Sequence, residues 1–184
     1  MSKLLLALLL LCTTPAVTLA AEKGEYYEQV YLSEEAALKQ VFGDLIPQKQ
    51  NLSLSAAQKK RIQKRLRRKL PENTLPFWVG SRQGTPERYA FILDEDGKHF
   101  PITFIVCLNS QAVVQQVAVM VYRERRGDGV KRARFLSQFA GKSGRDPIEV
   151  DTDIIHLTGS TISSWSVAAG VRKALVLLEE AILK

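Results

Sequence analysis

The fold is decided by the stretch Phe100-Pro-Ile-Thr-Phe-Ile-Val-Cys-Leu108, Asn109-Ser-Gln111 and Ala112-Val-Val-Gln-Gln-Val-Ala-Val-Met-Val-Tyr122. It contains two runs rich in β-branched and aromatic residues, joined by a short polar segment, which is typical of two neighbouring strands. We therefore predict strands at residues 100–108 and 112–122. Because both runs are mostly apolar, we expect the sheet that they build to be well covered.

Two further strands are predicted just upstream, at residues 75–81 and 87–93. Residues 82–86 separate them and carry Gly and Pro, which favour a turn. Residues 94–97 end in Asp-Gly, a pair suited to the positive backbone angles of a hairpin turn, and they are expected to close the next hairpin. The four predicted strands form an antiparallel meander.

Helices are predicted on both sides of this meander. Ser33, with acidic residues after it, starts a short helix that Gly43 ends, and Ser55 caps a basic helix that ends before Pro71. Residues 130–139 place apolar side chains on one face, and residues 148–157 are expected to be largely extended. The fold class is therefore α+β, with an antiparallel sheet of about four strands packed against helices.

The last predicted helix is also the longest and covers residues 161–183. Apolar residues recur along it every three or four positions, as expected of a buried stripe: Val167, Val171, Leu175, Leu178 and Ile182. Residues 21–74 are expected to form a helical N-terminal region that packs with residues 75–184 as one globular unit.

Residues 1–20 read as a signal peptide. Lys3 precedes a leucine-rich run, and small residues follow at Thr18 and Ala20, where a signal peptidase cleaves. Export is the expectation, to the periplasm or the outer face of the cytoplasmic membrane, and a retained N-terminal anchor is the alternative. Removing this segment leaves Cys107 as the only cysteine, so no intrachain disulfide forms, and its apolar neighbours predict a small buried hydrophobe.

The chain carries a net charge of +7, and residues 59–69 hold much of the excess. Ile62, Leu66 and Leu70 recur every four residues within and just beyond that run, which indicates an amphipathic surface helix. Its long basic side chains either cover apolar surface or dock an anionic membrane surface or an acidic redox partner. Nucleic acid is not expected, because no aromatic residues interleave the basic run.

The motif Thr158-Gly159-Ser160-Thr161 opens directly onto the last predicted helix. The first amides of a helix have no intrahelical partner, and the positive end of the helix dipole lies beside them. A phosphate group is stabilised at such a place. Ser163 and Ser164 follow in the first turn, where each is either a phosphate contact or part of the helix cap.

This motif resembles the Ser/Thr-Gly-Ala-Thr flavinylation motif of the FMN-binding domain in the G subunit of the Rnf complex and the C subunit of the sodium-pumping NADH:quinone reductase. Ser160 stands where that family usually has alanine. The likeness continues at residues 121–124, at Gly127, at residues 134–142 and at Asp153-Ile154. It covers about residues 75–184 and is nearest to small exported single-domain FMN-binding proteins.

The resemblance implies that FMN is attached covalently through a phosphoester to Thr161. The reagent is FAD, and the catalyst is a separate FAD:protein FMN transferase, so this chain supplies no catalytic residue. Trp165, one turn beyond Thr161, either packs on the flavin or belongs to the core. The cofactor-binding residues implied are Thr158, Gly159, Ser160, Thr161, Ser163, Ser164 and Trp165.

The function that this resemblance implies is electron transfer by an exported flavoprotein, with a membrane-associated redox partner. Basic residues in loops either stabilise the reduced flavin or are solvated surface charges: Arg123, Arg125, Arg126 and Lys142. His156 lies in an apolar run and is expected to be structural. No metal-ligand spacing, phosphate-binding loop or dinucleotide fingerprint occurs in the sequence.

Two other functions remain open at the level of sequence. One is a flavin-dependent reductase that turns over its own small-molecule substrate. The other is a non-redox binding module that docks a partner through the basic helix of residues 59–69.

Overall fold

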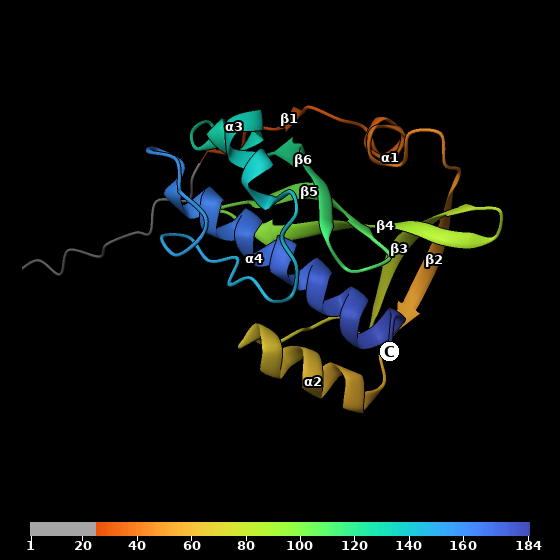
Figure 1. Cartoon of the computed structure of the whole chain (residues 1–184). Helices are drawn as coiled ribbons and strands as arrows, with labels where there is room; N and C mark the ends of the chain where they lie inside the picture. Colours follow the sequence, from red (N-terminus) through yellow and green to blue (C-terminus); the bar gives the residue numbers. More distant parts are fainter. Residues whose placement is uncertain (1–24) are drawn as a thin grey trace, which may run out of the picture.

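The computed structural model describes residues 25–184, which form an α+β fold around one antiparallel sheet (Figure 1). The sheet has six strands in the order β1-β6-β5-β4-β3-β2. The strands are β1 (Gln29–Val30), β2 (Pro47–Ser53), β3 (Thr74–Arg82), β4 (Thr85–Asp96), β5 (Pro101–Asn109) and β6 (Val114–Tyr122). Strands β3 to β6 follow one another in sequence and in space, so they form a meander.

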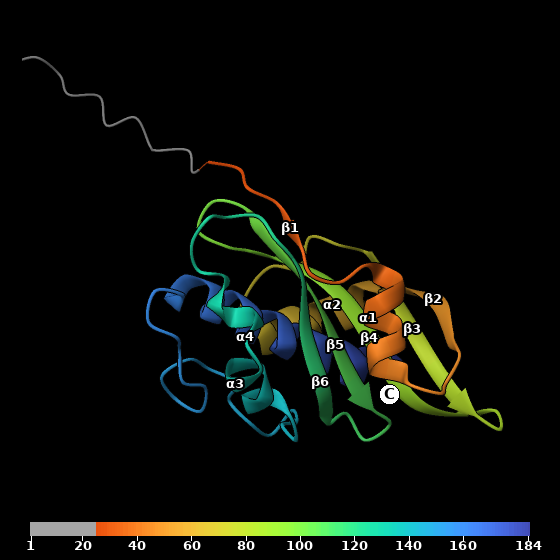
Figure 2. The same cartoon turned by 90° about the horizontal axis from the view of Figure 1, so that it is seen from above.

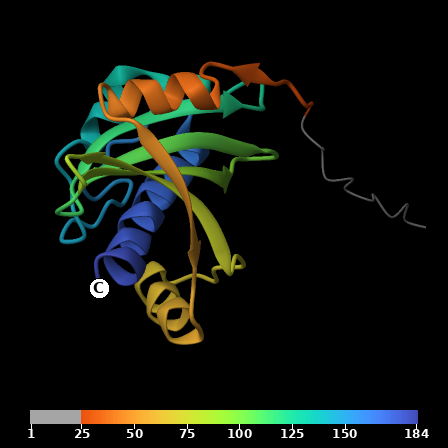
Figure 3. The same cartoon turned by 90° about the vertical axis from the view of Figure 1, so that its right-hand side faces the viewer.

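Helices cover both faces of this sheet, as the side view shows (Figure 3). Helix α4 crosses one face with α2 packed beside it, and α1 lies across the other. The helices are α1 (Glu34–Phe42), α2 (Ala56–Leu66), α3 (Ala133–Leu136) and α4 (Thr161–Leu177). Short 3-10 turns occur at η1 (Asp128–Lys131) and η2 (Ser137–Phe139), and a π-helical segment, η3 (Leu178–Ile182), continues α4.

The larger core lies between the sheet and α4. Alternate residues of the central strands point into it, among them Phe91, Phe104 and Val106, which are fully buried. Gly170 of α4 packs directly on the Phe104 ring, because a Cβ at that position would collide with the ring. The glycine therefore lets the helix approach the sheet closely.

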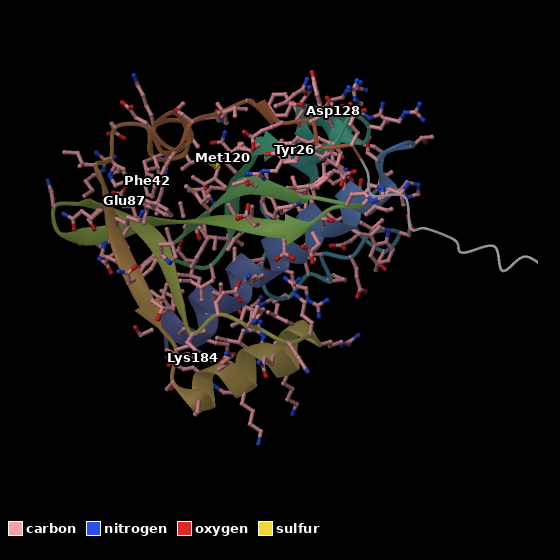
Figure 4. All side chains as sticks on the ribbon, turned by 180° about the vertical axis from the view of Figure 1, so that it is seen from behind. Tyr26, Phe42, Glu87, Met120, Asp128 and Lys184 are labelled. Carbon is pink, nitrogen blue, oxygen red and sulfur yellow. The ribbon has the colours of Figure 1, made fainter. Side chains whose placement is uncertain are left out.

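A second, smaller core lies on the opposite face of the sheet, beneath α1. Successive side chains of a strand alternate in direction, so the strand residues that do not point into the larger core point into this smaller one. Phe42 of α1 and Met120 of β6 both belong to it, and both lie on the α1 side of the sheet in Figure 4. Both faces are thus buried, which explains the nearly continuous apolar runs of the central strands.

The structure confirms the predicted meander and the predicted caps. Ser33 is the N-cap of α1, and its hydroxyl accepts a hydrogen bond of 3.1 Å from the amide of Ala36. Ser55 caps α2 with a reciprocal capping box through Gln58. The apolar stripe of α4 is buried from Val167 to Leu178, and the basic helix buries Ile62.

The predicted α+β class is confirmed, and the sheet has two strands more than the predicted meander, because β1 and β2 extend it from the region expected to be helical. Three local predictions were wrong. Residues 94–96 continue β4 instead of turning, and the turn closes further on, where the Gly97 amide donates to the Phe100 carbonyl at 3.0 Å. Residues 130–139 form η1, α3 and η2 instead of one helix. Residues 148–157 form no strand: a turn at residues 151–153 interrupts them, and φ is positive at Ile148 and Asp151.

The predicted signal peptide at residues 1–20 lies outside the described part of the chain. Within residues 25–184, no helix is both long and apolar enough to cross a membrane.

Candidate functional site

The motif at residues 158–161 forms the turn that starts α4. The Ser160 amide donates to the Leu157 carbonyl at 2.8 Å, and Gly159 adopts a φ of +79° that favours glycine. Ser160 is the N-cap residue of α4, but its hydroxyl accepts no hydrogen bond from the helix amides. The first turn therefore lacks the side-chain cap that α1 and α2 have, which leaves its amides available to an anion.

Thr161 is the first residue of α4, and its side chain is exposed. It lines an open cleft of about 540 Å³ between the start of α4 and two loops. The loop that joins β4 to β5 contributes Lys98 and His99, and the segment after β6 contributes residues 124–127. The Thr161 hydroxyl is thus accessible to a second protein and faces a cavity that also holds basic groups.

Positive charge predominates among the free side chains of this cleft. Glu25 pairs with Arg125 at 2.7 Å, and the Glu124 carboxylate accepts from the backbone amide of His99 at 2.8 Å. Lys98 and Arg126 also line the cleft, and neither has an ion-pair partner among residues 25–184. An anion that enters the cleft therefore meets these two cations and the charged Glu124 carboxylate, so positive charge exceeds negative charge by one in the lining.

A buried hydrogen-bond chain holds the Arg126 segment against the first turn of α4. The Tyr122 hydroxyl donates to the Arg126 carbonyl at 2.8 Å and shares a hydrogen bond of 2.8 Å with the Ser163 hydroxyl. Burial raises the pKa of Tyr122, so the phenol keeps its proton. Gly127, at a φ of +94°, has no room for a Cβ between these two hydroxyls. The loop and the turn of residues 158–161 are thereby fixed relative to each other.

The other residues of the predicted site lie around this cleft in different ways. Gly159, Ser160 and Ser163 line it together with Thr161. Ser164 is fully buried, and its hydroxyl donates to the Ser160 carbonyl at 2.9 Å, so it braces the turn from inside.

Thr158 and Trp165 lie outside the lining of the cleft. Thr158 lines a separate hollow of about 300 Å³ on the other side of the turn, beside Arg132 and Arg134. Trp165 is half exposed and lines a third hollow next to Arg68. The contact predicted between Trp165 and a flavin ring stays a prediction.

Two of the four loop cations reach the cleft. Arg125 and Arg126 line it, whereas Arg123 bonds to Glu28 and Lys142 pairs with Asp153 at 2.7 Å. The sequence did not point to Lys98, His99 or Ile162 as residues of the site. Ile162 directly follows Thr161 and could have been included. Lys98 and His99 have no signal in the sequence, because only the packing of α4 on β4 and β5 brings their loop to the cleft.

The remaining candidate groups have structural partners. The His156 ring lies 2.7 Å from the Asp151 carboxylate. Cys107 is fully buried, and burial raises its pKa to about 11, so it is an inert core residue. No group of three or more His, Cys, Asp or Glu side chains within the described residues could hold a metal ion.

The basic helix directs part of its charge inward. Arg61 and Arg65 both pair with the buried carboxylate of Glu180 at 3.1 Å, and Arg68 makes two bonds of 2.6 Å to buried Glu95. The interpretation as a covering surface helix therefore describes part of α2. Four exposed cations of the run have no ion-pair partner among residues 25–184, two within α2 and two after its end: Lys60, Lys64, Arg67 and Lys69.

No protein-family model matches this sequence, and the search among curated proteins finds no match.

Proposed function

We propose that this protein is an exported electron carrier that holds FMN in a phosphoester linkage to Thr161. The observation that carries this proposal is the exposed Thr161 hydroxyl at the uncapped start of α4, beside a basic cleft of about 540 Å³. A phosphate on Thr161 lies where the helix dipole and the first-turn amides stabilise negative charge.

The surroundings of Thr161 fit such a group. The cleft extends from the acceptor towards Lys98 and Arg126, so it offers room and positive charge beyond the phosphate. FMN supplies the electron-transfer chemistry through its isoalloxazine ring. Lys98 and Arg126 then stabilise the negative charge that the reduced ring acquires.

Loading needs a second protein. The Thr161 oxygen forms a bond to the phosphorus of the FMN half of FAD, the pyrophosphate P–O bond to the other half breaks, and AMP leaves. The hydroxyl proton passes to a base of the FAD:protein FMN transferase. Because a threonine hydroxyl is a weak nucleophile, its activation belongs to that enzyme. The exposure of Thr161 is what the transferase requires.

Intact mass tests the proposal. The full-length chain is expressed in the exported compartment with an FAD:protein FMN transferase, and the mass and visible absorbance of the purified protein are measured. We expect a gain of one FMN less one water, and its loss in Thr161→Ala. Thr158→Ala is the matched control, because Thr158 is also an exposed threonine of the same turn but lines a separate hollow.

Each outcome of this experiment decides a separate point. An unmodified wild-type chain overturns the carrier proposal, and an equally modified Thr161→Ala overturns the residue assignment. Reduction of a small-molecule substrate by the loaded protein in steady turnover replaces the carrier with a flavin-dependent reductase. Ser160→Ala keeps the turn, because the Ser160 hydroxyl does not cap the helix, and it should load at least as well as the wild type.

The redox partner is membrane-associated in this proposal, and the exposed cations of α2 provide contact with an anionic membrane surface. Flotation with vesicles tests this part. We expect binding to vesicles that contain anionic lipid, little binding to neutral vesicles, and weaker binding for Lys60→Gln combined with Lys64→Gln. Equal binding of the variant excludes this surface, and salt-sensitive binding to an acidic protein alone assigns it to a protein partner.

A further inference from the structure

The hollow of about 300 Å³ beside the start of α4 is lined by four side chains that can donate hydrogen bonds. Thr158 and Ser160 line it from the turn before the helix, and Arg132 and Arg134 line it from the α3 region. Figure 2 shows α3 and the segment before it close to the amino end of α4. Thr161 lines the cleft but not this hollow, so a ligand here is distinct from a group on the Thr161 hydroxyl.

The Ser160 hydroxyl points towards this hollow and lacks a partner. Ser160 is 7% exposed, and its hydroxyl makes no hydrogen bond within residues 25–184. A Cβ built on Gly129 would lie 2.9 Å from the Ser160 oxygen, and Gly129 lines the hollow but not the Thr161 cleft. Buried polar groups are nearly always hydrogen-bonded, because an unmade bond is costly. The free hydroxyl therefore indicates a ligand atom in the hollow.

The two arginines of the hollow are free to bind that ligand. Arg132 and Arg134 are exposed, and neither guanidinium has a hydrogen-bond or ion-pair partner in the described part of the chain. Asp128 is the one carboxylate of the lining, and it accepts from Lys131 at 2.7 Å and from the Tyr31 hydroxyl at 3.2 Å. Positive charge thus exceeds negative charge by one in the lining, and a cation outside the lining already engages the carboxylate.

We propose that this hollow binds a small phosphate, either the inorganic ion or the phosphate of a small monoester. A guanidinium presents paired N–H donors that match two phosphate oxygens, so Arg132 and Arg134 supply both charge and geometry. The hydroxyls of Ser160 and Thr158 donate to the oxygens that remain. A phosphate uses all four donors, whereas a carboxylate has only two oxygens to offer them.

The size of the hollow limits what else the ligand carries. Pockets for cofactors and drug-sized molecules have volumes of about 300–1,000 Å³, so this one is at the lower end of that range. A phosphate with few further atoms fits such a space. The site is independent of the proposed flavin, because Thr161 is not part of its lining.

Isothermal titration calorimetry with inorganic phosphate tests the proposal. The full-length chain is produced without a transferase, so that no flavin is attached, and is titrated in a chloride buffer of constant ionic strength. We expect one site, and binding about tenfold weaker for Arg134→Gln and for Ser160→Ala, because each variant loses a hydrogen bond to a charged group. Arg145→Gln is the matched control, since Arg145 is another exposed arginine and lines neither the hollow nor the cleft. It should bind phosphate within about twofold of the wild type.

The source of the phosphate is distinguished by two further titrations, with glycerol 3-phosphate and with vesicles that contain phosphatidic acid. Tighter binding of glycerol 3-phosphate than of the inorganic ion assigns the hollow to a monoester, and the reverse order assigns it to the free ion. Binding to the vesicles without binding of either small phosphate overturns the proposal.

Amide chemical shifts of the wild type locate the bound ion without any variant. Phosphate should move the amide signals of Gly129 and Ser160 and leave that of Lys98 unchanged. Shifts at Lys98 and Arg126 instead place the ion in the Thr161 cleft and overturn the proposal. No binding of phosphate, or equal binding to Arg134→Gln and the wild type, overturns it as well. Thr161→Ala should bind phosphate as the wild type does, so a failure of flavin loading leaves this result unchanged.

Discussion

The two ends of α4 are built in opposite ways. The carboxyl half, together with η3 that continues it, is mostly buried from Val171 to Leu178. Ion pairs hold it to Arg65 of α2, to Glu72 in the loop after α2 and to Glu95 of β4. The amino end exposes Thr161 and Ile162, has no side-chain cap and borders the open cleft. The carboxyl end of the helix therefore anchors it in the core, and the amino end is accessible to solvent.

The difference shows how one helix can expose a hydroxyl at its amino end while its other end is anchored in the core. Thr161 is positioned because the helix that carries it is fixed farther along, where buried Lys173 lies between Glu72 and Glu95. Figure 4 shows the distant end, where Lys184 lies close to α2 and far from Asp128 and the start of α4. Changes at the anchored end should affect folding, and changes at the open end should affect loading.

The largest effect on stability is expected for Glu95→Ala. Glu95 is buried, receives two hydrogen bonds of 2.6 Å from Arg68 and lies 4.0 Å from the Lys173 ammonium. Its removal takes both hydrogen bonds from Arg68, which is partly exposed, and leaves buried Lys173 with Glu72 as its carboxylate partner, so the expected cost is about 2–3 kcal/mol. Urea unfolding measures the free energy. The matched control is Glu34→Ala, which breaks an exposed pair and should cost less than about 1 kcal/mol. Similar costs for both would contradict the anchoring role of Glu95.

The ion pairs of Glu180 should make the anchored end sensitive to acid. The pKa of this carboxyl falls from its ordinary 4.5 to about 2 because three cations donate hydrogen bonds to it, Lys184, Arg61 and Arg65. The folded state favours the charged carboxylate, so its contribution is complete above pH 4.5 and is lost as the pH falls towards 2. Urea unfolding across this range should show a steeper loss for the wild type than for Glu180→Gln. Parallel pH profiles would contradict this assignment.

Gly170→Ala tests the packing of α4 on the sheet. Alanine favours a helix over glycine by about 1 kcal/mol, but the new methyl collides with the Phe104 ring, and overpacking costs about 1–3 kcal/mol. We expect a net loss of up to about 2 kcal/mol in thermal or urea unfolding. The neighbouring Ala169→Gly is the reverse substitution without that collision and should lose about 1 kcal/mol from propensity alone. A Gly170→Ala variant that gains stability would show that α4 is packed more loosely.

Much of the meander could be predicted from sequence because its strands carry strong local patterns. The edge strands could not. The exposed polar residues of β2, such as Lys49, alternate only weakly, and β1 consists of two residues that are strands only because β6 lies beside them. The extension of β4 through Asp96 was missed for a related reason, since Glu95 points into the core as a buried charge.

The candidate site divides in the same way. The turn at Gly159 and the start of α4 at Thr161 follow from local sequence, and the structure has both. The Tyr122–Ser163 hydrogen bond and the approach of Lys98 do not follow from local sequence, because each joins residues far apart in the chain. The local sequence thus predicts the turn of residues 158–161, whereas the cleft beside it follows only from the folded structure.

Gly159→Ala separates backbone angle from packing at the open end. A Cβ on Gly159 meets nothing within 4 Å, so the cost of alanine comes from its φ of +79° alone. That strain is about 1–2 kcal/mol for a residue with a Cβ. Asparagine tolerates such angles better, so Gly159→Asn should recover part of the loss in thermal unfolding. Equal stability of wild type and Gly159→Ala would show that the turn relaxes to another conformation.

Ser163→Ala should have the smallest effect on stability and a specific effect on the cleft. The variant removes one hydrogen bond to the Tyr122 hydroxyl, which still donates to the Arg126 carbonyl, so the cost is about 1 kcal/mol. The loop of Arg126 and Gly127 then loses its link to the first turn of α4. Compared with the wild type, amide exchange should become faster in that loop and stay unchanged in β5. Ser137→Ala, which removes only an exposed bond of 3.4 Å, is the control and should leave both measurements unchanged. Unchanged exchange in Ser163→Ala would mean that the loop of Arg126 and Gly127 is held without α4. The open end of α4 would then not fix the cleft.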